Sequence, residues 1–211
     1  TLHDSISRVA TGLRVLGGND AASQSLANTL NARAKSFQAA ERNSNSGIAF
    51  LQLAESALTE LNNLATRLKE VGIADTNSNN TASDTAALNS EAVYVSDTID
   101  SIVSSLTYNG INVLGTSSIT KAIGINDAGN TQTIQSTTGI GATNINDATN
   151  ANTSMDTSLG EITTSLGAVA GGLTSLQSYR NVASTTAAHL IAAASNLQDT
   201  DFAEETAKIT T

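Results

Sequence analysis

Apolar and small residues recur at alternating spacings of three and four over residues 21–73, and no proline interrupts this stretch. The spacing predicts one amphipathic helix that buries a narrow stripe against partner helices. Because a helix rises 1.5 Å per residue, roughly 53 residues span about 80 Å, and we expect an elongated, rod-like molecule. The stripe stays buried only if an equally long element lies beside it.

Two further helices are predicted from heptad spacings, over about 83–107 and 154–198. A short polar connection makes the second helix an antiparallel neighbour of the distal half of the first. The third helix is long enough to run antiparallel along most of the first, which brings the two chain ends to the same end of the bundle. We expect the seam within the chain to be formed by Leu26, Leu30, Phe37, Leu51, Leu58, Leu61, Leu68, Ile99, Ile102, Leu159, Leu166, Leu173 and Leu176.

The period changes after the second helix. Asn109–Gly110 is a strong turn dipeptide, and alternating apolar residues follow, so a hairpin region is expected over 108–153. The fold class is therefore mainly α: an elongated antiparallel bundle of long helices with a small β-hairpin region. We expect a terminal helix and joint over 1–20, a helical core domain over 21–198, and the start of a C-terminal inner segment over 199–211.

Four glycines lie inside the predicted third helix: Gly160, Gly167, Gly171 and Gly172. Each costs up to about 1 kcal/mol relative to alanine in a helix interior. We expect this cost to be offset because small residues allow a neighbouring backbone to approach closely.

Composition and charge exclude several function classes. The net charge is -9 and the ten basic residues are scattered, so we expect no nucleic-acid partner. No apolar run reaches the length of a membrane span, and we expect no membrane partner. The protein has no cysteine, and its His, Ser and carboxylate residues form no catalytic or metal-ligand pattern. We therefore expect no enzyme activity, no cofactor and no metal site.

Several local strings resemble bacterial flagellin, the filament subunit of the rotary flagellum, and they occur in family order over nearly the whole chain. The strings are Ile6–Arg14, Asn19–Ala22, Ala40–Ile48, Glu55–Asn63, Tyr108–Leu114 and Asn196–Glu205. The resemblance implies a structural subunit that assembles with copies of itself into an extracellular filament for motility. It also implies the flagellar export chaperone and hook-associated proteins as partners.

The resemblance leaves one alternative open, a hook–filament junction protein that shares the terminal helices. The strings at Ala40–Ile48 and Asn196–Glu205 favour flagellin. From the resemblance, we expect the extreme termini and the variable outer domains typical of the family to be missing from these 211 residues. We therefore expect a fragment that does not polymerise alone.

The resemblance also implies a receptor-binding surface near the end of the first long helix. In many flagellins this region engages the vertebrate Toll-like receptor for flagellin, and Arg67 matches the key arginine of the family. The corresponding residues here are Arg67, Leu68, Lys69, Val71 and Asp97, with Val71 and Asp97 in place of the family's usual Leu and Glu. The alternative interpretation is that Arg67 lies on a solvated helix face.

Overall fold

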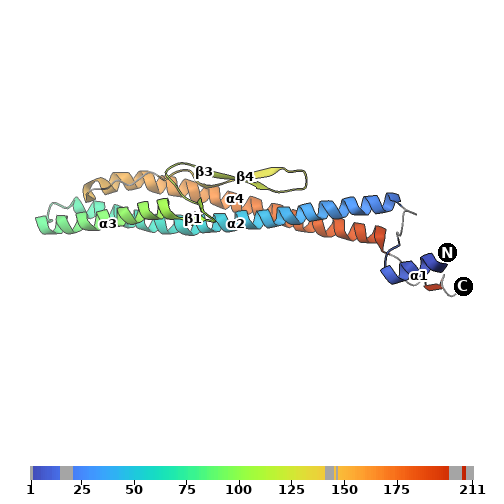
Figure 1. Cartoon of the computed structure of the whole chain (residues 1–211). Helices are drawn as coiled ribbons and strands as arrows, with labels where there is room; N and C mark the ends of the chain where they lie inside the picture. Colours follow the sequence, from blue (N-terminus) through green and yellow to red (C-terminus); the bar gives the residue numbers. More distant parts are fainter. Residues whose placement is uncertain (1, 15–20, 141–144, 146, 200–205, 208–211) are drawn as a thin grey trace. The chain divides into compact units, whose positions relative to one another are not determined.

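The computed structural model describes residues 2–14, 21–140, 145, 147–199 and 206–207 (Figure 1). Long helices dominate the described residues and two small hairpins accompany them, which confirms the expected mainly α fold class. The elements are α1 (Leu2–Thr11), α2 (Ala21–Asp75), α3 (Ala82–Ser105), β1 (Thr107–Tyr108), β2 (Ile111–Asn112), β3 (Ile119–Gly124), β4 (Thr131–Thr137) and α4 (Ala148–Gln198). The protein divides into two compact units: unit 1 comprises 1–43, 124–130 and 179–211, and unit 2 comprises 44–123 and 131–178.

Within unit 2, α2 and α4 run antiparallel in close contact. A Cβ atom added to Gly72 would lie 2.7 Å from the backbone nitrogen of Asn152, near the start of α4. A Cβ atom added to Gly47 would lie 2.7 Å from Leu176, much further along α4. The largest completely buried side chains of the three helices are Leu51, Leu58, Leu61, Leu68, Ile99, Met155, Ile162 and Leu176.

The third helix of unit 2, α3, contributes Ala92, Ile99 and Val103 to the same core. On the same helix, the side-chain oxygen Oδ1 of Asn89 accepts a hydrogen bond of 2.8 Å from the backbone nitrogen of Ala148. This bond satisfies an otherwise unpaired donor at the start of α4.

The hairpin β3–β4 lies against α4 through small helix residues. Ser165 is completely buried, and its hydroxyl accepts a hydrogen bond of 3.0 Å from the backbone nitrogen of Thr138. One heptad further along α4, Gly172 faces Ile134, whose side chain would lie 3.6 Å from an added Cβ atom. Residues seven apart lie on the same face of a helix, so Ser165 and Gly172 both face this hairpin arm.

In unit 1, α2 and α4 contact each other mainly through alanine. Ala40, Ala183 and Ala187 pack with Phe37 in one buried cluster, and Leu190 covers it. The loop of the β3–β4 hairpin is joined to α2 by an ion pair of 2.6 Å between Arg33 Nε and Asp127 Oδ2. Near the two ends of the protein, Leu13 and Asp199 form an isolated antiparallel bridge.

One expected seam residue is wrong. Leu26 is 51% exposed, whereas its neighbour Ala27 is completely buried. The pattern selects the larger side chain, but a close helix pair favours the smaller one, because alanine lets the two backbones approach. Leu30 is partly buried, and Phe37 is buried in the alanine cluster.

Two further expectations need correction. The last helix begins at Ala148 and not at residue 154, so residues 148–153 are helical and do not belong to a hairpin region. Gly160, Gly167 and Gly171 have no atom of the described residues within 4 Å of an added Cβ atom. Of the four helix glycines, Gly172 alone has close neighbours: a Cβ atom added to it would lie 2.8 Å from the side chain of Leu51.

Candidate interaction surface

The surface predicted around Arg67 lies on α2 and α3 of unit 2, close to the turn that joins these helices. Thr76 caps the end of α2 by donating from its backbone nitrogen and its hydroxyl to the carbonyl of Ile73, at 3.1 and 2.7 Å. Asn80 donates to the carbonyl of Ala74 at 2.9 Å. These bonds satisfy carbonyl groups that the helix end leaves unpaired, so α3 can start immediately after the turn.

The first turn of α3 is closed by a capping box between Thr81 and Asp84. The carboxylate of Asp84 accepts hydrogen bonds from the hydroxyl and the backbone nitrogen of Thr81, at 2.7 and 2.9 Å. These two bonds lower the pKa of Asp84 below its ordinary value, because they stabilise the charged form.

Arg67 is exposed but holds two acidic neighbours. Its Nη2 and Nε atoms lie 2.6 and 2.7 Å from Oε1 of Glu91 on α3. Its Nη1 atom lies 3.3 Å from Oε2 of Glu70, one turn further along α2. The hydrogen bond to Glu91, followed by the bond to Glu70, raises the pKa of Arg67. The guanidinium therefore stays charged, and its Nε–Nη2 edge is used by Glu91.

Lys69 points to a different neighbour. Its ammonium group pairs with the carboxylate of Asp156 on α4, and the Lys69 side chain is 33% exposed. Arg67 and Lys69 therefore link α2 to α3 and to α4 respectively, and they do not form one continuous basic patch.

Two residues of the predicted surface are not available to a partner. Leu68 is completely buried and Val71 is 2% exposed, and both belong to the hydrophobic core of unit 2. The resemblance to flagellins predicts them at the surface because they lie close to Arg67 in the sequence. A helix turns by about 100° per residue, however, so adjacent residues face different directions. Leu68 belongs to the buried seam between the helices, as its spacing predicts, and its side chain is not exposed to a receptor.

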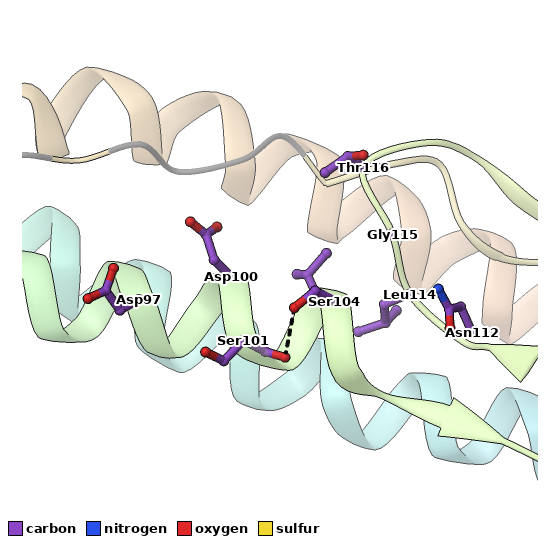
Figure 2. Close-up of a pocket in the computed structure, with 9 residues that line it drawn as sticks. Asp97, Asp100, Ser101, Ser104, Asn112, Leu114, Gly115 and Thr116 are labelled. Carbon is purple, nitrogen blue, oxygen red and sulfur yellow. Dashed lines mark hydrogen bonds between the residues drawn. The ribbon is translucent and has the colours of Figure 1, made fainter. Parts of the chain in front are cut away.

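Asp97 is exposed on α3 and lines an open hollow of about 730 Å³. Figure 2 shows Asp97, Asp100, Ser101 and Ser104 on α3, and the segment from Asn112 to Thr116 on another side of this hollow. Ser104 donates to the carbonyl of Ser101 at 3.3 Å. Asp97 and Asp100 give this hollow two carboxylates, and both residues lie on the same helix as Glu91.

Sequence reasoning missed Glu91, the main partner of Arg67. Glu70 follows Arg67 at helical spacing and could have been found from the sequence, because residues three apart on a helix are neighbours. Glu91 lies 24 residues away on another helix. Its contact depends on the register between α2 and α3, for which the sequence carries no direct signal.

The remaining predicted seam residues differ in burial. Ile102, Leu159, Leu166 and Leu173 are partly buried and pack against the core. Ser158 is 5% exposed, and Ser165 is completely buried. On α4, these partly buried leucines therefore border a buried stripe in which large residues (Met155, Ile162, Leu176) alternate with the small residues Ser158 and Ser165.

The described residues contain no group of three or more His, Cys, Asp or Glu side chains placed to hold a metal ion. Among the same residues, no helix combines the length and the apolar character that crossing a membrane requires.

Residues 1–119 match the sequence model of the bacterial flagellin N-terminal helical region. This match covers more than half of the sequence. The chain belongs to the flagellin family.

Curated flagellins agree with this assignment. The flagellin of Salmonella typhimurium is 35% identical over 128 residues, which cover 60% of this chain and 26% of that protein. The flagellin of Escherichia coli K12 is 36% identical over 128 residues, with the same two shares. The chain thus spans about a quarter of the length of the curated flagellins it matches.

Among solved structures, the chain is similar to the crystal structure of Bacillus cereus flagellin. The TM-score is 0.44 at 21% identity, and the match covers 74% of this chain and 93% of that one.

Proposed function

We propose that this flagellin is a structural subunit of an extracellular bacterial flagellar filament, which assembles with copies of itself for motility. The match of residues 1–119 to the flagellin N-terminal helical region carries the proposal. The export chaperone and the hook-associated proteins are the further partners that the resemblance implies. The work of such a subunit is mechanical, and catalysis has no part in it.

The exposed face of α4 supports this proposal. Gly160, Gly167 and Gly171 are separated from one another by seven and then four residues, so they lie on one face of the helix. No atom of the described residues lies within 4 Å of a Cβ atom added to any of them, so packing among these residues does not require glycine at the three positions. Glycines on an outer face allow the backbone of a neighbouring subunit to approach closely.

Quantitative mass spectrometry of filaments sheared from cells that express the protein tests this function. We expect the protein in bulk along the filament. A few copies per filament would instead favour the hook–filament junction protein, and its absence would contradict both proposals.

A second role, as a ligand of the vertebrate Toll-like receptor for flagellin, is supported by the exposure of Arg67, Lys69 and Asp97. A planar, charged guanidinium is a frequent anchor of protein interfaces. Glu91 and Glu70 must release Arg67 before a receptor carboxylate can bind it through the same nitrogen atoms.

We expect Arg67→Ala to lower receptor activation in a cell reporter assay about tenfold or more, which corresponds to an interface anchor. Arg42→Ala is the matched control, because Arg42 is an exposed arginine of the same helix α2. Equal activation by both variants and the parent protein would exclude a contact through Arg67.

A further inference from the structure

We propose that Asn109 is a site of spontaneous deamidation, in which the backbone nitrogen of Gly110 attacks the side-chain amide of Asn109. This inference rests on the geometry of one hairpin turn and is independent of the proposed function.

Asn109 and Gly110 form the two-residue loop between β1 and β2. The strands pair antiparallel, with Thr107 opposite Asn112 and Tyr108 opposite Ile111. Asn109 has φ 51° and Gly110 has φ 74°, the left-handed values that a type I′ turn requires at both positions. Asn109 is the one described residue other than glycine with a positive φ.

The reacting groups are accessible. Asn109 is exposed, and no atom of the described residues lies within 4 Å of a Cβ atom added to Gly110. Because glycine has no side chain, nothing on Gly110 itself shields its nitrogen from Cγ of Asn109. This is the single Asn–Gly dipeptide of the sequence.

The turn can open locally at low cost. Each strand of this hairpin has two residues, and an isolated two-stranded hairpin is marginally stable in water. The flanks are held more firmly: the ring of Tyr108 contacts Phe50 edge to face at 6.0 Å between centroids, and Val113 is completely buried. Opening is therefore confined to the turn, which gives Asn109 and Gly110 the freedom to reach the reactive geometry.

The chemical step is balanced with water as the only co-reactant. The Gly110 nitrogen loses its proton and forms a bond to Cγ of Asn109, while the bond from Cγ to the amide nitrogen Nδ2 breaks; Nδ2 gains one proton in return and leaves as ammonia. Water then opens the resulting five-membered succinimide ring at either carbonyl. One product is aspartate, and the other is isoaspartate, in which the backbone passes through Cβ and Cγ of the former asparagine.

Asparagines inside helices lack this reactivity. Asn43 and Asn45 are each followed by serine in α2, in the interior of the helix. There the next backbone nitrogen takes part in the regular helix hydrogen bonds, and it cannot turn toward the asparagine amide without breaking the helix.

The products change the surface next to the turn. Asn109 and Lys121 line the same hollow of about 250 Å³, together with the exposed Ile111. Deamidation places a carboxylate in this hollow. Isoaspartate also lengthens the backbone of a turn that is only two residues long, so the pairing of Tyr108 with Ile111 cannot persist unchanged.

The test is to incubate the folded protein at mildly alkaline and at slightly acidic pH, and to map products by peptide mass spectrometry and isoaspartyl methyltransferase labelling. We expect the peptide with Asn109 to convert before every other asparagine peptide, faster at the higher pH, and into both isoaspartate and aspartate. Asn109→Gly is the matched control, because glycine accepts the left-handed turn and offers no amide to attack. It should abolish the label at this peptide and leave the circular dichroism spectrum unchanged.

A parallel incubation in urea separates the effect of the fold from that of the sequence. The proposal is overturned if Asn109 stays intact in the folded protein while the unfolded protein converts completely. It is also overturned if another asparagine converts first, or if aspartate forms without isoaspartate.

Discussion

At the residue scale, side-chain size decides which positions fit the closest contacts of unit 2. Gly72 on α2 lies directly against backbone atoms of α4, with Asn152 N at 2.7 Å and Ala148 O at 3.0 Å from an added Cβ atom. Backbone atoms cannot rotate away as the end of a side chain can, so the two helices must separate to accept even one methyl group. Gly171 has no such neighbour among the described residues.

Gly72→Ala should therefore lower the free energy of unfolding by about 1–3 kcal/mol, the usual cost of overpacking. Gly171→Ala is the control: it lies in open space, and the better helix propensity of alanine should raise the free energy by about 0.5–1 kcal/mol. Urea denaturation followed by circular dichroism measures both. If both variants were stabilised alike, the close approach of α2 and α4 at Gly72 would be wrong.

Residue size also explains where sequence reasoning failed. The heptad pattern places Leu26 in the seam, whereas the buried position beside it is Ala27. A pattern based on hydrophobicity gives more weight to leucine than to alanine or serine. How closely two backbones approach depends on the partner helix, which that pattern does not contain.

At the element scale, burial of one stripe accounts for the stability of α2. Leu58 is completely buried in the core of unit 2, whereas Ile73, on the same helix and in the same unit, is 52% exposed. The two residues have equal numbers of carbon atoms and differ mainly in the surface they bury.

We expect Leu58→Ala to cost about 2–5 kcal/mol, since it removes buried methyl groups and leaves a cavity. Ile73→Ala should change the free energy of unfolding by less than about 0.5 kcal/mol, as is usual for an exposed site. Denaturant unfolding of both variants, with equal m-values, measures the difference. Similar losses at the two positions would show that α2 buries a different face.

The capping box of α3 predicts a pH dependence. The pKa of Asp84 is lowered in the folded state by hydrogen bonds from Thr81. Its contribution to stability is therefore present above the unfolded pKa of about 4, and it is lost as pH falls through the lower folded pKa. Asp84→Asn should lose this contribution at every pH.

The difference in melting temperature between the parent protein and Asp84→Asn should therefore be largest near neutral pH and should decrease in acid. Asp97→Asn, an exposed carboxylate of the same helix without a role in the cap, should show a smaller difference at neutral pH. A difference for Asp84→Asn that grew on acidification would contradict the role assigned to the capping box.

The long helices were predictable from the sequence because their apolar period extends over many turns. The start of α4 was not, because residues 148–153 are polar and carry no helical pattern apart from Ala148 and Ala151. Both alanines are completely buried, and Asn89 of α3 holds the first nitrogen of the helix. Tertiary contacts therefore extend this helix beyond the point where its periodicity ends.

At the scale of the whole molecule, a flagellin sequence folds into two packed units. The motifs at Ile6–Arg14 and Tyr108–Leu114 suggested the flagellin family, and the match over residues 1–119 confirms it. The sequence places five residues on the proposed interaction surface, and they differ in exposure. Arg67, Lys69 and Asp97 are exposed or partly exposed, whereas Leu68 and Val71 are buried.

Electron cryo-microscopy of filaments from cells whose flagellin contains this sequence tests the central claim most directly. We expect a subunit in which α2, α3 and α4 pack as described, with the glycine face of α4 against a neighbouring subunit. Filaments that lack the protein, or subunits in which Leu58 and Ile162 face solvent, would contradict it.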